Sequence, residues 1–318
     1  MYKQFEKNTI FSYVFIILLY VLLGIKLFKA SHYQSNFTES VLLGQIFNFQ
    51  NLSLNFNLSL QFLIIFILGL SQYFIYKNLS FSGRSTLVYQ VIFLINTIIA
   101  LSFDYNFMDI VQLSFVTLFF TTLARTNKEQ QTTSMFFDIG FFYGLSLLIS
   151  MKLLLLLPVM IFSINIFGKN SFRDFWGFLF GLLVPIYLFV TYLYFIDQEQ
   201  WMLIYLKSMH FFNYEFIHRI EIIAIILIVI KGISAFSVVA SYNINTRKFY
   251  TVLLSMYLIL ILFYVFFEYN HSKSFLSLFF IGALYMSALY SSFRKGRMKN
   301  ILLISGFLLA IIVTFVPI

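Results

Sequence analysis

The sequence contains no cysteine, and only 10% of its 318 residues carry a charge. The absence of cysteine excludes disulfide bonds, thiolate metal ligands and a cysteine nucleophile. Soluble domains contain about 25% charged residues, so this chain has too few charges to cover a water-facing surface. The sequence also has no Walker A loop, no GxGxxG and no HExxH motif, which leaves no motif-based evidence for a nucleotide or zinc-protease site.

Hydrophobic residues make up 61% of the chain and gather in apolar runs of membrane-spanning length. We therefore expect an all-α fold, a polytopic transmembrane helix bundle that forms a single integral membrane domain over residues 1–318. The hydrophobic runs predict about eleven spans, at residues 10–28, 59–76, 85–103, 110–124, 135–150, 152–167, 175–196, 221–241, 249–267, 274–292 and 299–317.

The apolar run over residues 136–167 is the most informative segment. As one helix it would be about 48 Å long, against a hydrocarbon core of roughly 30 Å. Lys152 is the only charge between Asp138 and Lys169, so a helical hairpin that turns near Lys152 is the simplest interpretation. A hairpin that only dips into the membrane would be re-entrant and would leave ten spans.

The basic residues predict the orientation of these spans. With a cytoplasmic N-terminus, 14 of the 21 Lys and Arg residues fall in predicted inner segments, among them the loops at 125–134 and 294–299. This is the positive-inside pattern. The net charge of +9 then reports membrane orientation, so we expect no nucleic-acid partner. The abundance of Phe, Ile, Asn, Tyr and Lys is typical of an AT-rich bacterial genome, which predicts a multi-pass protein of the bacterial inner (cytoplasmic) membrane.

Two predicted outer segments are long enough to have structure of their own. In the first, over residues 30–57, apolar and polar residues alternate from Leu52 onward, which predicts an extended piece leading into the second span. The second, residues 197–220, predicts an interfacial helix because aromatic and apolar residues recur at helical spacing. Such a helix would be a docking surface for other envelope membrane proteins.

Few polar side chains are candidates for chemistry. His32, His210, His218 and His271 are scattered and lack a neighbouring acid cluster, so we predict no metal site and no cofactor. Lys231 lies in the middle of a predicted span, where a charge costs roughly 3 kcal/mol, so we expect it to face a cavity or a partner.

Three carboxylates on the predicted outer side are candidate catalytic residues. Glu39 lies in the first long outer segment, between apolar residues, and Asp104 and Asp109 lie in the short connection SFDYNFMD. Acids also occur in short loops simply because water reaches them, so a role in solvation alone stays open for all three.

The segment from Gly144-Leu145 through Lys152 to Pro158 resembles a piece of the GT-C glycosyltransferases, which use lipid-phosphate-linked sugars at the outer membrane face. The resemblance covers about residues 1–190, with an N-in first span followed by an acid-bearing outer loop. It implies a catalytic acid among Glu39, Asp104 and Asp109, and a polyprenyl-phosphate-linked sugar as substrate. Cations that could hold the lipid phosphate are Lys152, Lys207, Arg219 and Lys231.

The chain is also similar to uncharacterised bacterial multi-pass membrane families of about 300 residues, a likeness that implies no function. Two interpretations therefore remain open beside each other. The first is a GT-C-like enzyme that transfers sugar from a lipid-phosphate carrier at the outer face of the inner membrane. The second is a non-catalytic subunit of a secretion, motility or assembly complex of the envelope. A transporter would need polar, broken helices at the membrane midplane, and few spans offer them.

Overall fold

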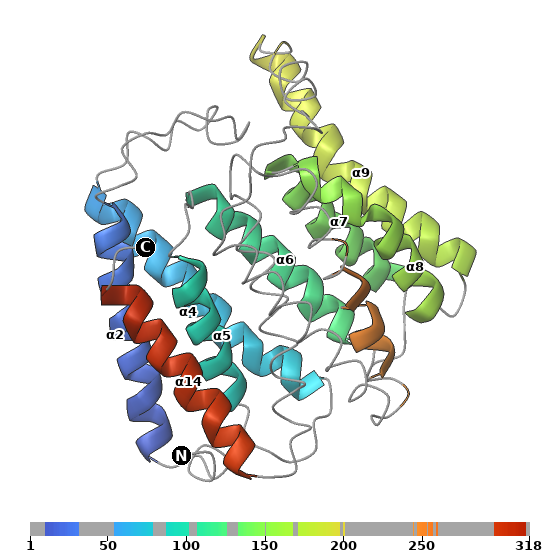
Figure 1. The fold of residues 1–318 in the computed structure, drawn as a ribbon. Helices are drawn as coiled ribbons and strands as arrows, with labels where there is room; N and C mark the ends of the chain where they lie inside the picture. Colours follow the sequence, from blue (N-terminus) through green and yellow to red (C-terminus); the bar gives the residue numbers. More distant parts are fainter. Residues whose placement is uncertain are drawn as a thin grey trace, which may run out of the picture.

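The computed structural model describes residues 10–31, 54–78, 87–101, 107–125, 133–149, 151–167, 171–197, 247–252, 254–256 and 296–315, together with residues 200, 244 and 259. All regular structure in these ranges is helical, which confirms the predicted all-α fold. The helices form a bundle in which α2 and α14 lie on one flank and α7, α8 and α9 on the other (Figure 1).

Each predicted span that falls in the described ranges corresponds to a helix. Their bounds are α2 Ile10–Ser31, α4 Leu54–Asn78, α5 Leu87–Ala100, α6 Phe107–Arg125, α7 Thr133–Ile149, the 3₁₀ helix η2 Met151–Leu156, α8 Leu157–Phe167, α9 Ser171–Phe195 and α14 Gly296–Phe315. The predicted spans at 221–241 and 274–292, and most of that at 249–267, lie outside the described residues.

Among the described helices, two are long and apolar enough to cross a membrane. They are Ile10–Lys29 and Phe172–Phe195, with mean hydropathies of 2.4 and 2.0. The other apolar helices have shorter qualifying stretches, and long apolar helices also occur in the cores of soluble proteins. Length and composition alone thus indicate that these two helices are possible membrane helices.

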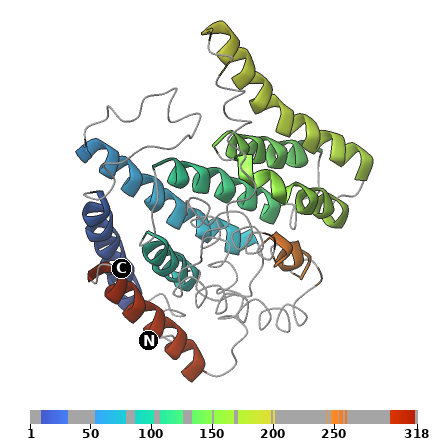
Figure 2. The same cartoon turned by 45° about the horizontal axis from the view of Figure 1, so that its top comes forward.

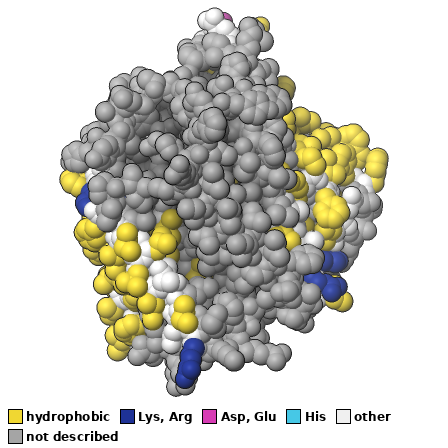
Figure 3. Space-filling view, viewed as in Figure 1, with side chains coloured by type: hydrophobic (Ala, Val, Ile, Leu, Met, Phe, Trp, Pro, Cys, Tyr) yellow, Lys and Arg dark blue, Asp and Glu magenta, His cyan; other side chains and the backbone are white. Residues whose placement is uncertain are grey.

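Large apolar side chains are exposed on both flanks of the bundle (Figure 3). On α9 they form a stripe whose members follow one another at intervals of three or four residues, on the side opposite the glycines that contact α7. The members of this stripe are Phe172, Trp176, Phe180, Leu183, Tyr187, Val190 and Tyr194. A helix face of this kind is favourable in contact with lipid or another apolar surface and unfavourable in water.

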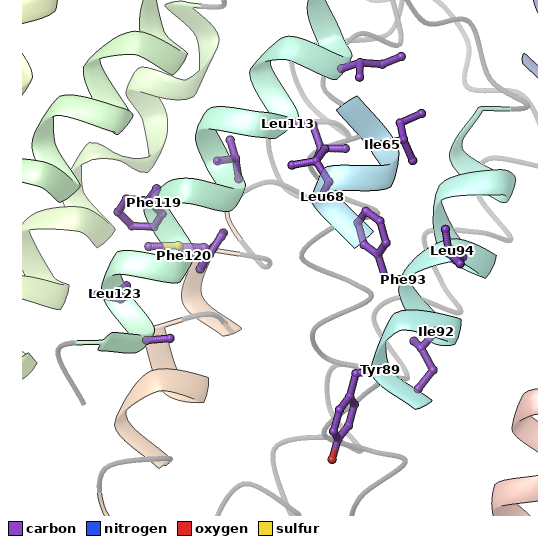
Figure 4. Packing of buried hydrophobic residues seen from close by; sticks show 14 of the residues in the cluster. Ile65, Leu68, Tyr89, Ile92, Phe93, Leu94, Leu113, Phe119, Phe120 and Leu123 are labelled. Carbon is purple, nitrogen blue, oxygen red and sulfur yellow. The ribbon is translucent and has the colours of Figure 1, made fainter. Parts of the chain in front are cut away.

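The buried core includes residues of all the described helices, and part of it lies between α4, α5 and α6. Figure 4 shows side chains of all three helices, among them Leu68, Phe93 and Leu113, gathered in one buried layer. Most side chains of α5 and α6 are buried or half-buried, whereas α4 also exposes Leu63, Phe66 and Ile67.

Helix directions follow from contacts between named residues. The Phe15 and Phe307 rings lie 4.7 Å apart, and near the other ends of the same helices Lys29 Nζ donates to the Thr314 carbonyl at 3.3 Å. The helices α2 and α14 are therefore parallel. Tyr20 contacts Phe66 of α4, whereas Gly24, one turn later, faces Phe62, so α4 runs against α2.

The closest helix pair is α7 with α9, and four glycines make it possible. A Cβ on Gly140 would fall on the Phe178 carbonyl oxygen, and one on Gly181 would fall on that of Phe137. Gly144 and Gly177 are similarly crowded, so both helices contribute a Gly-x-x-x-Gly pair to one contact. Contacting residue numbers rise together along the two helices, which makes them parallel. Small residues at this spacing are typical of helix association in membranes.

The predicted hairpin is confirmed. The helix α7 ends at Ile149, and Tyr143 Oη donates to the Leu153 carbonyl at 2.6 Å, so the chain has already turned back by Leu153. The return arm consists of η2 and α8 and is about 28 Å long, close to the roughly 26 Å of α7. It returns the chain to the start of α9, which is why α7 and α9 run in the same direction.

The predicted extended piece from Leu52 onward is wrong where it can be compared with the structure. Residues from Leu54 are helical and form the beginning of α4. Alternation of apolar and polar residues indicates a strand only when one face meets water. On α4, the Gln61 side chain donates from Nε2 to Asn57 Oδ1, four residues earlier, so these two polar residues lie on the same face of the helix.

Candidate functional site

Most of the predicted site residues lie outside the described ranges. These are Glu39, Asp104, Lys207, Arg219 and Lys231, together with nearly all of the predicted interfacial helix at 197–220. Asp109 is placed in the first turn of α6 and Lys152 in η2, as positions on these helices. Their roles stay predictions.

One end of the bundle brings the elements of Asp109 and Lys152 together. Ile149, at the end of α7, packs against Leu60 and Ile64 in the first half of α4 and against Val111 and Phe115 in the first half of α6. We call this the α4–α6–α7 end. Asp109 precedes Val111 by two residues, and Lys152 follows Ile149 by three, so both positions belong to this end.

The other two candidate acids precede the same helix starts in the sequence. Glu39 lies in the stretch that leads into α4, and Asp104 lies three residues before the start of α6. The three predicted acids and Lys152 are thus on, or directly connected to, elements that meet at the α4–α6–α7 end.

Buried serine and threonine hydroxyls elsewhere in the bundle donate hydrogen bonds within their own helices. Thr97, Thr117 and Thr314 donate to the carbonyls of Phe93, Leu113 and Ala310, four residues earlier. Ser146 and Ser163 donate three residues back. Such bonds let Ser and Thr lie in an apolar interior without an outside partner.

The buried side-chain amide of Gln90 is satisfied by a hydrogen bond to another helix. Gln90 Nε2 of α5 donates to Tyr20 Oη of α2 at 3.1 Å. The hydroxyl lies against Gly69 of α4, where a Cβ would clash with it. Three helices therefore meet at this hydrogen bond, which serves packing.

Two glutamines at the α4–α6–α7 end differ from these groups. Gln61 of α4 and Gln112 of α6 are 0% and 1% exposed. In this described part of the chain, Gln61 Oε1 and Gln112 Nε2 have no hydrogen-bond partner. The sequence analysis missed both because it considered charged residues and histidines. The signal was a lone amide within each apolar run, LSLQFLII and DIVQLSFV.

At the opposite end, Asp174 is buried beside the starts of two parallel helices. It lies in the first turn of α9, and Thr133 Oγ1 at the start of α7 donates to its Oδ1 at 3.5 Å. A carboxylate here offsets the positive ends of both helix dipoles. Within the described ranges, no three His, Asp or Glu residues are grouped closely enough to hold a metal ion.

No protein-family model, curated protein or solved structure matches this chain. The resemblance to GT-C glycosyltransferases stays a prediction.

Proposed function

We propose that this chain is a multi-pass protein of the bacterial cytoplasmic membrane, with the α4–α6–α7 end on the outer side. Three arginines at the opposite end of the bundle support this orientation, whereas Lys29 in the last turn of α2 lies at the same end as the start of α4. Arg125 ends α6, Arg173 is in the first turn of α9, and Arg297 is in the first turn of α14. The apolar flanks and the glycine contact of α7 with α9 support lipid as the surrounding medium.

We further propose that the protein transfers a sugar from a polyprenyl-phosphate carrier at that end. This proposal is based on the α4–α6–α7 end. Asp109 and Lys152 lie on elements that meet there, and Glu39 and Asp104 precede the starts of α4 and α6 in the sequence. An acid and a cation at one membrane surface are the groups that such a transfer requires.

The proposed reaction is a substitution at the anomeric carbon. A carboxylate, with Glu39 the first candidate, takes the proton of the acceptor hydroxyl as its oxygen bonds to that carbon. The bond from the anomeric carbon to the phosphate oxygen breaks, and the lipid phosphate leaves with the electron pair. Lys152 would stabilise the negative charge of the departing phosphate as a point charge.

A second candidate function is a non-catalytic subunit of an envelope complex, and the shape of α9 favours it. The later half of α9 extends beyond the other described helices (Figures 1 and 2). It exposes Tyr187 and Phe195 at 70% and 77% and leads into the predicted docking segment 197–220. A partner protein would cover this projecting surface.

The two functions are distinguished by isosteric substitution of the acids. We expect Glu39→Gln, Asp104→Asn or Asp109→Asn to abolish an envelope glycan, since loss of a general base costs about 10² to 10⁴ in rate. The measurement is the glycan profile of cells in which each variant replaces the wild-type gene at equal protein level. Asp138→Asn, an exposed acid on α7, is the control and should leave the profile unchanged. A wild-type profile in all three variants would exclude the enzyme and leave the subunit function.

A further inference from the structure

Gln61 and Gln112, which each have one buried amide atom without a partner, lie at a similar level of the bundle. Gln61 follows Leu60, and Gln112 follows Val111, and both neighbours belong to the group that packs around Ile149. The helices α4 and α6 run side by side in the same direction (Figures 1 and 2). Gln61 is about two turns and Gln112 about one and a half turns from the start of its helix, and the two helices are neighbours.

These two atoms are costly in the structure as it stands. A buried polar atom without a partner costs about 1–3 kcal/mol. The buried serines and threonines avoid this cost by bonding within their helices, and Gln90 avoids it by bonding Tyr20. Leu or Met would fill either glutamine position without the cost, so a ligand is the simplest reason for an amide there.

The two free atoms define the chemistry of the ligand. Gln61 Oε1 is an acceptor that needs a donor, and Gln112 Nε2 is a donor that needs an acceptor. A hydroxyl can donate and accept at once, whereas a phosphate or carboxylate only accepts. The pair therefore matches a hydroxylated ligand better than an anion.

The Gln61 amide is held by a residue in the first turn of the same helix. Asn57, half-buried in the first turn of α4, accepts a hydrogen bond from Gln61 Nε2 at 3.1 Å. This bond fixes the amide so that its oxygen stays available.

We propose that Gln61 and Gln112 are the hydrogen-bonding residues of a site for hydroxyl groups at the α4–α6–α7 end. The hydroxyls come from the sugar of the lipid-linked donor, an assignment that rests on the proposed function, or from internal water. A sugar carries several hydroxyls within a few ångströms, so it can reach both helices without the two amides touching.

The test compares the full-length protein with Gln61→Met and Gln112→Met in lipid nanodiscs. Thermal unfolding is measured alone, with undecaprenyl phosphate, and with undecaprenyl-phosphate-linked hexose, so that the difference between the two carriers isolates the sugar. Thr117→Val is the matched control, because Thr117 is equally buried on α6 but bonds its own helix. Asn57→Leu measures what the Asn57 bond alone contributes.

If sugar hydroxyls bind, the hexose raises the unfolding temperature of wild type and Thr117→Val, and both Met variants lose that rise. If water binds, the Met variants unfold at lower temperature than wild type, Gln61→Met by more than Asn57→Leu, whatever the carriers do. If the hexose does not stabilise the wild-type protein, the proposed transferase function is contradicted. The unfolding temperatures of the Met variants without any carrier would still show whether the two glutamines bind water. The proposal would be overturned if Gln112→Met unfolded at the wild-type temperature, Gln61→Met unfolded no lower than Asn57→Leu, and both Met variants kept any response to the hexose.

Discussion

At the scale of single residues, the contact between α7 and α9 depends on positions that lack a side chain. Gly140 and Gly181 each lie against a backbone carbonyl of the other helix, so even one methyl group has no room. Gly24 of α2 is different, because the nearest atom to a Cβ there is Phe62 Cε2 at 3.9 Å, an ordinary contact distance.

We therefore expect Gly181→Ala to destabilise the protein by about 1–3 kcal/mol, the usual cost of overpacking. Gly24→Ala should be neutral or slightly stabilising, because alanine favours the helix and meets no obstruction. Unfolding temperatures of the two variants in the same detergent are the measurement. Equal behaviour of the two alanine variants would show that α7 and α9 are not in close contact.

The candidate site could be predicted from the sequence only in part. Charge at a membrane surface stands out in a chain with 10% charged residues, which is how Asp109 and Lys152 were found. A glutamine carries no charge, and whether it is paired depends on neighbours far away in sequence. Gln90 and Gln112 look alike in their apolar runs, yet Gln90 bonds Tyr20 and Gln112 Nε2 has no partner.

At the scale of elements, apolar runs predicted the described helices well because a helix satisfies its backbone hydrogen bonds internally. The hairpin was predictable because length and a single charge pointed to the same turn. The strand-like piece before the second span was wrong because residues from Leu54 belong to α4. Which helices pack together was not predictable, because the return arm of the hairpin, η2 and α8, separates the glycines of α7 from those of α9 in the sequence.

The parallel pairing of α7 and α9 can be tested in the native chain, because it contains no cysteine. A Cβ on Gly177 lies 2.9 Å from Thr133 Cγ2, so Thr133→Cys with Gly177→Cys should form a disulfide under mild oxidation. Thr133→Cys with Thr191→Cys joins opposite ends of the two helices and should stay reduced. Bridging in the second pair and not the first would mean that the helices are antiparallel.

At the scale of the whole molecule, helix directions and the positions of three arginines agree on one arrangement. The helices α4 and α6 begin where α7 ends, and the basic residues Arg125, Arg173 and Arg297 lie at the other end. The helix directions do not depend on the spans predicted from the sequence, because contacts between named residues set them. This arrangement places every candidate site residue that the structure describes at the end opposite those arginines.

The most direct measurement of this account is the sidedness of two exposed positions, Gln200 after α9 and Arg297 at the start of α14. Gln200→Cys and Arg297→Cys are expressed separately and treated with a membrane-impermeant maleimide, before and after the membrane is permeabilised. The account predicts that Gln200→Cys is labelled in intact spheroplasts and Arg297→Cys only after permeabilisation. Labelling of both from the same side, or recovery of the protein in the soluble fraction, would contradict it.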